Sequence, residues 1–247
     1  TAVILVGELR AWLKAAKCLF DYFDHQEHQI DYFFVTWSTT RTFWWPEEKS
    51  SMTTRDVNAA EILAPFVRHE KNLVDYMIVE YPNRENLSFY YQGYLSQYAN
   101  KLKKGHEKAQ NYVYDHVVEM RPDLFIREPY AKWDVADNNV LFGGPVWPDQ
   151  TTGKMMMQDF YYRSNSATND ILAQRYTYRP QGDPAVTPTE NEQLIISWLS
   201  SKGVVIKPHC DYGFNFIIRP NFPKDLAGLT MDEAKRLDQE WIAYQWQ

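Results

Sequence analysis

Short apolar runs alternate with amphipathic stretches along the first part of the chain. The run 2–6 is continuous, rich in β-branched residues and closed by Gly7, which predicts a central strand buried on both faces. Segment 9–23 places its large apolar residues on one stripe at helical spacing, which predicts an amphipathic helix. The alternation then continues and predicts strands at 30–37, 75–80, 115–120 and 139–142, and helices at 56–66 (closing near Pro65) and 88–112.

The pattern is looser in the second part of the chain. A proline-rich loop is predicted at 178–188, and the helix that follows it is predicted to end before Gly203. Near the end of the chain, Thr230 and Glu233 form a capping-box pattern at the start of an amphipathic stretch. These signals predict helices at 166–176, 190–201 and 230–244, and strands at 204–206 and 214–219.

Strands that alternate with helices are typical of a wound sheet. The order of the predicted elements therefore indicates an α/β, Rossmann-like fold with a mostly parallel central sheet flanked by helices. The 247 residues suffice for one large core, and the sequence shows no internal repeat or linker. We expect a single domain over 1–247, with the C-terminal helix at about 230–244 packing on it.

Composition narrows the classes of partner and location. The net charge of −6 argues against general nucleic-acid binding, so no nucleic-acid partner is expected. Cys18 and Cys210 are too few for a disulfide framework and are interpreted as buried thiols in a reducing compartment. No apolar stretch approaches the ~20 residues of a membrane span, and the run 2–6 is too short for a signal peptide. These features predict a cytoplasmic protein.

Charged side chains follow two of the predicted strands where each strand ends. Parallel sheets bind ligands at the carboxyl ends of their strands, and Arg10 and Asp123 lie in the loops after the first and fourth strands. Arg10 could clamp phosphate oxygens through two hydrogen bonds, and Asp123 could hold Mg²⁺ or Mn²⁺. Each also has a structural interpretation, in which Arg10 lies on a first helical turn and Asp123 caps the turn after Pro122.

An ordered set of short motifs resembles a group of small bacterial and virus-encoded glycosyltransferases. The resemblance begins at Gly7-Glu8-Leu9-Arg10, which looks like a G-x-x-R opening, and it covers about residues 2 to 219. The remaining matches are Thr36-Trp37, Met120-Arg121-Pro122-Asp123-Leu124, Asp159-Phe160, the series Glu192, Leu194, Leu199, Gly203 and 204–206, and Arg219.

The resemblance implies a GT-A fold that binds a nucleotide-sugar donor and a glycan or other hydroxyl acceptor. Carried over to this chain, it places the donor against Gly7, Arg10, Trp37, Arg121 and Asp123, with Asp123 as the ligand of a divalent cation or of the donor ribose. Trp37 also fits a place in the core. Arg121 also fits an ion pair with Glu119 or a neighbouring acid.

An inverting transferase needs a general base that takes the proton of the acceptor hydroxyl. Asp159 is the first candidate and Glu192 the second. Both have structural interpretations, because Asp159 fits a turn or N-cap and Glu192 lies near a helix start, where acids favour the helix dipole.

Two departures from the resembled pattern leave cation use open and support an alternative function. The sequence contains no Asp-x-Asp motif, and Glu119 stands where the family often has an arginine. The alternative is a non-catalytic glycan-binding or interaction protein on a degenerate GT-A fold. The sequence argues against dinucleotide dehydrogenases, P-loop enzymes and α/β-hydrolases, because it lacks their glycine-rich or nucleophile motifs.

Overall fold

The fold was analysed in a computed structural model of residues 1–247. The residues that this structure describes are 1–10, 12–24, 29–41, 54–80, 91–126, 137–143, 146–148, 155–157, 161–175, 188–208 and 215–217.

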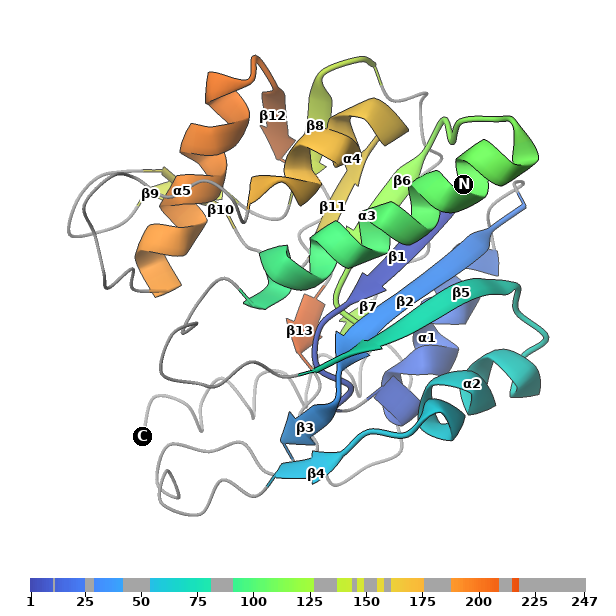
Figure 1. The fold of residues 1–247 in the computed structure, drawn as a ribbon. Coiled ribbons are helices and arrows are strands. Elements are labelled where there is room, and N and C mark those ends of the chain that lie inside the picture. The colour runs from blue at the N-terminus through green and yellow to red at the C-terminus, as the bar shows by residue number, and fades with distance from the viewer. Residues whose placement is uncertain are drawn as a thin grey trace, which may run out of the picture.

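A seven-stranded sheet forms the centre of the molecule (Figure 1). Its order across the sheet is β12 (Val205–Pro208), β8 (Val140–Gly143), β11 (Tyr161–Ser164), β6 (Val117–Met120), β1 (Ala2–Val6), β2 (Asp31–Trp37) and β5 (Leu73–Val79). Strand β11 runs antiparallel to both of its neighbours, and the other pairings are parallel. The mostly parallel α/β architecture predicted from the sequence is confirmed.

Helices cover both faces of this sheet. Helices α1 (Trp12–Asp24) and α2 (Ala59–Arg68) lie on one face, and α3 (Tyr91–Gln110), α4 (Ser166–Ala173) and α5 (Pro188–Ser201) lie on the other (Figure 1). The structure also describes three two-stranded ladders, which pair β3 (Thr39–Arg41) with β4 (Thr54–Asp56), β9 (Val146–Pro148) with β10 (Met155–Met157), and β7 (Leu124–Ile126) with β13 (Asn215–Ile217).

Strand β1 shows why a continuous apolar run predicts a central strand. Val3 and Leu5 pack in the cluster under α1 and α2, whereas Ala2, Ile4 and Val6 pack in the cluster under α3. All five residues have no exposed surface. A strand between two helical layers needs an apolar side chain at every position, because both of its faces are buried.

The amphipathic helices α1 and α2 are held by aromatic packing. Trp12, Phe20 and Phe66 bring their ring centroids within 5.2 to 5.7 Å of one another, and Phe66 is 2% exposed. This packing explains why α2 extends past its predicted end. Helix α2 does not close near Pro65 but continues to Arg68, because the burial of Phe66 outweighs the one backbone hydrogen bond that proline removes.

Several short strands were not predicted from the sequence. The structure adds β3, β4, β7, β9, β10 and β11 to the predicted elements. Strand β11 is the important omission, since it lies inside the sheet between β6 and β8. The sequence pattern does not indicate a buried strand there, because β11 carries a charged residue. Arg163 is 7% exposed and lies 4.2 Å from the ring centroid of Phe142 on β8.

The other predicted boundaries differ from the observed ones by up to three residues, and Gly203 ends α5 as expected. Its φ is +71°, and the next amide, that of Val204, donates to the carbonyl of Leu199. The predicted helix at 230–244 lies outside the described residues. None of the helices in the described part of the chain has the length and apolar character needed to cross a membrane.

Candidate functional site

The order in which the strands are added to the sheet reverses between β1 and β6. From β1 the chain moves through α1 to β2 and then to β5 on one side, and it later returns through α3 to β6 on the other side of β1. Open α/β sheets bind ligands in the crevice at the carboxyl ends of their strands, where the strand order reverses in this way. The carboxyl ends of β1 and β6 are therefore the first place to look for a site.

The residues predicted after the first and fourth strands meet at this point. Because Leu5 of β1 aligns with Met120 of β6 in parallel register, the loops that follow the two strands lie next to each other. A Cβ atom added to Gly7 would lie 3.4 Å from Cδ of Pro122 and 3.9 Å from Cγ of Arg121. Gly7 itself has a φ of +141°, which side-chain-bearing residues rarely adopt. The φ of Gly7, and not the space around it, is therefore what favours glycine at this position.

Asp123 lies at the centre of a compact ionic cluster. Arg121 donates from Nε to one carboxylate oxygen over 2.9 Å and from a terminal nitrogen to the other over 2.8 Å. Arg10 brings a second guanidinium within 3.6 Å of the same carboxylate. The Asp123 side chain is only 1% exposed, so water screens these interactions weakly.

Arg10 is also held from its own loop. Its Nε donates to the carboxylate of Glu8, and its backbone amide donates to Oγ1 of Thr40 on β3 over 3.0 Å. Glu8 and Thr40 were not predicted as site residues. Glu8 was within reach of sequence reasoning, because an acid two residues from a candidate phosphate-binding arginine in one short loop is a natural partner. Nothing in the local sequence around Thr40 marks it as a neighbour of Arg10.

Four of the predicted site residues are thus brought together, namely Gly7, Arg10, Arg121 and Asp123. The structural interpretation of Arg121, an ion pair with Glu119 or a neighbouring acid, is confirmed, and the acid is Asp123. Whether these four residues bind a nucleotide stays a prediction.

Trp37 ends β2 at the same edge of the sheet but points into the core. It is 2% exposed and stacks on Tyr94 of α3, with ring centroids 5.8 Å apart and an interplanar angle of 7°. The core interpretation therefore describes Trp37 in this structure, and stacking on a nucleobase stays a prediction.

The two predicted general bases are not placed relative to the cluster. Asp159 lies outside the described residues. Glu192 belongs to α5, and its side chain is also outside the description. Their catalytic roles stay predictions.

The donor set around Asp123 does not fit a divalent cation as it is arranged. Both carboxylate oxygens already accept hydrogen bonds from Arg121, and a cation there would lie beside two guanidinium groups. Within the described ranges, no group of three or more His, Cys, Asp or Glu side chains is placed to share a metal ion.

A second buried ionic group lies below this edge, on the α3 side of the sheet. Glu119 of β6 is 1% exposed and accepts from Arg175 over 2.8 Å and from Ser96 over 2.6 Å. Arg175 also donates to Ser96 over 2.8 Å and lies over the ring of Tyr162. This group joins β6 to α3 and to the end of α4, and sequence reasoning did not find it.

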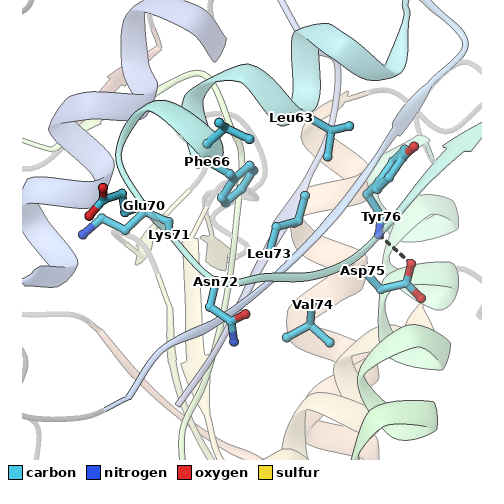
Figure 2. Close-up of a pocket in the computed structure, with 10 residues that line it drawn as sticks. Leu63, Phe66, Glu70, Lys71, Asn72, Leu73, Val74, Asp75 and Tyr76 are labelled. Carbon is cyan, nitrogen blue, oxygen red and sulfur yellow. Dashed lines mark hydrogen bonds between the residues drawn. The ribbon is translucent and has the colours of Figure 1, made fainter.

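A cavity of about 440 Å³ lies elsewhere, between α2 and the edge strand β5 (Figure 2). Phe66, Leu63 and Leu73 give it an apolar wall, and Lys71 and Asp75 are among its polar residues. Leu73 aligns with Tyr32 near the start of β2, so this end of the cavity is far along the strands from the carboxyl edge. It contains none of the predicted site residues.

Comparisons with known proteins identify no family. No protein-family model and no curated protein matches the sequence. Among solved structures, the chain is similar to a nucleoside-diphosphate-sugar pyrophosphorylase from Vibrio cholerae RC9, with 13% identity, a TM-score of 0.39 and coverage of 85% of this chain and 91% of that one. It is also similar to a glycosyltransferase involved in the glycosylation of the major capsid of PBCV-1, with 10% identity, a TM-score of 0.42 and coverage of 84% and 81%. Likeness at this level carries no conclusion about activity.

Proposed function

We propose that this chain binds a nucleotide-sugar donor at the carboxyl ends of β1 and β6 and transfers the sugar to a glycan or other hydroxyl acceptor. The observation that carries the proposal is the meeting of Arg10 and Arg121 at the point where the strand order reverses. The guanidiniums come from two separate loops, and arginine is suited to bind diphosphate oxygens through paired hydrogen bonds.

The chemistry of sugar transfer explains why two guanidiniums would be useful there. As the bond between the sugar and the diphosphate breaks, negative charge grows on the leaving diphosphate. Donors held in fixed positions in a poorly solvated site stabilise that charge without first having to reorient. Glu8, Asp123 and Thr40 hold the two arginines in this way.

The acceptor side of the reaction needs a general base. Asp159 is our first candidate, and Glu192 is the second. A carboxylate in this role would take the proton of the acceptor hydroxyl while the oxygen of that hydroxyl attacks the anomeric carbon of the donor sugar. Replacing each by its amide and measuring kcat separates them, because only loss of the base lowers turnover by the 10²–10⁴-fold typical of general base catalysis.

A thermal-shift screen tests the binding half of the proposal. UDP, GDP, CDP and dTDP and their sugars are added separately to the full chain. A nucleotide at ~100 times its dissociation constant stabilises the fold by about 2.7 kcal/mol, which such an assay resolves. We expect one nucleobase to give a shift and Arg10→Gln to reduce it strongly.

Arg68→Gln is the matched control, because it removes the same charge from an exposed position at the end of α2. Its shift should equal that of the unaltered chain. If no nucleotide shifts the transition and oligosaccharides do, the glycan-binding alternative replaces this proposal.

A further inference from the structure

We infer that the site binds the donor diphosphate through hydrogen bonds from the guanidiniums of Arg10 and Arg121, and that Asp123 holds these two groups in place and does not bind a divalent cation. This inference rests on the proposed function. It reverses the role that the sequence suggested for Asp123.

The Asp123 carboxylate is already engaged by hydrogen bonds from arginine. Mg²⁺ and Mn²⁺ bind carboxylate oxygens directly. In Asp123 each oxygen accepts a hydrogen bond from Arg121, and the side chain has 1% of its surface exposed. A cation bound to either oxygen would lie beside the guanidinium of Arg121 and close to that of Arg10, which is 3.6 Å from the same carboxylate. Repulsion between these positive charges opposes the binding of a cation.

The charges of the cluster balance. Glu8 and Asp123 carry two negative charges, and Arg10 and Arg121 carry two positive charges. The pairing offsets the cost of holding two poorly exposed guanidiniums, whose side chains are 7% and 16% exposed. A cation needs a site with excess negative charge, and this cluster offers none among its four members.

The pairing with Asp123 also sets the orientation of the Arg121 guanidinium. A guanidinium has five N–H donors in one plane, and the pairing of Arg121 with Asp123 uses two of them, on one edge. That edge-on pairing fixes the plane of the guanidinium. Asp123 therefore acts as a positioning residue, which sets the direction in which Arg121 presents its donors to the leaving group.

The test measures nucleotide affinity of the full chain by titration calorimetry, first in EDTA and then in Mn²⁺. The probe is the nucleoside diphosphate that gives the largest thermal shift. We expect the two dissociation constants to agree within about threefold. Binding that is more than about tenfold tighter in Mn²⁺ overturns the inference and leaves the proposed function standing. Lack of binding in both buffers overturns both.

Two variants complete the test. Arg121→Gln should weaken binding about 10- to 100-fold in both buffers, the range expected for the loss of charge-assisted hydrogen bonds. Asp123→Asn should change the affinity by the same factor in EDTA as in Mn²⁺, since a positioning role does not involve the metal. If the Asn variant loses affinity in Mn²⁺ only, Asp123 is a metal ligand and the inference is wrong. Arg68→Gln serves again as the charge-matched control.

Discussion

At the scale of single residues, the buried Glu119 decides how β6 is held. Its carboxylate accepts from Arg175 and Ser96, and all three side chains are nearly enclosed. A buried ion pair adds little net stability compared with apolar groups of similar size, but the loss of one partner is costly because the other charge stays buried. The charge of Glu119 is therefore stabilised by Arg175 and not by water.

We expect Glu119→Gln to lower the free energy of unfolding by about 3–5 kcal/mol, measured by urea denaturation. Combining it with Arg175→Met should cost less than the sum of the two single changes, because no unpaired charge then remains. The exposed pair between Arg55 and Glu61 provides the comparison, and Arg55→Met should cost less than about 1 kcal/mol. A loss below 1 kcal/mol in Glu119→Gln would mean that the pair does not bear on stability.

Lys103 is a second buried charge, on the inner face of α3. It has no exposed surface, and its ammonium group donates to the side chain of Ser166 over 2.6 Å and to Asp170 over 3.2 Å. Burial lowers the pKa of Lys103, although Asp170 and Glu107 offset part of that effect. Between this lowered pKa and the ordinary value of 10.5, the unfolded chain binds more protons than the folded chain.

The contribution of Lys103 to stability should consequently rise with pH across that window. Replacing Lys103 by Met should make the free energy of unfolding rise less, or fall more, between pH 7.5 and 10 than in the unaltered chain. Lys104→Met is the control. The hydrogen bond to Asp170 raises the pKa of Lys104. The contribution of Lys104 to the free energy of unfolding therefore changes with pH only above 10.5. Equal pH dependence in the Lys103→Met variant and the unaltered chain would refute this account.

At the scale of elements, the loop after β1 begins with a glycine whose φ side-chain-bearing residues rarely adopt. Gly7 follows β1 with a φ of +141°, and a side chain there would contact Pro122 after β6. Gly105 in α3 has nothing within 4 Å of an added Cβ atom. The same substitution should therefore have opposite effects at these two positions.

Gly7→Ala should lower the free energy of unfolding by about 1–3 kcal/mol, the cost of forcing a side-chain-bearing residue into a strained conformation. Gly105→Ala should raise it by about 0.5–1 kcal/mol, because glycine is a poor residue inside a helix. Denaturant titration of both variants checks the pair. A Gly7→Ala variant as stable as the unaltered chain would show that the loop tolerates a side chain.

The elements that sequence patterns predicted well are those with one strong local signal. Strand β1 is apolar at each position, and Gly203 follows α5 with a φ of +71°, as its place after the predicted helix suggested. Strand β11 was missed because its buried Arg163 imitates an exposed position, although tertiary contacts cover it. Local sequence does not show which charges the fold will enclose.

At the scale of the whole molecule, the sequence predicted the parallel sheet and four residues that meet at its carboxyl edge. It predicted their types and their loops, because the carboxyl ends of parallel strands converge. It did not predict that the guanidinium of Arg10 would lie 3.6 Å from the carboxylate of Asp123, since that depends on how the separate loops after β1 and β6 meet. The ionic cluster is a property of the tertiary structure.

A crystal structure of the chain with the nucleoside diphosphate selected by the thermal-shift screen tests the central claim most directly. The account predicts that the diphosphate lies beside Gly7, with phosphate oxygens within hydrogen-bonding distance of the guanidiniums of Arg10 and Arg121. A nucleotide bound elsewhere, for example in the cavity between α2 and β5, would contradict it.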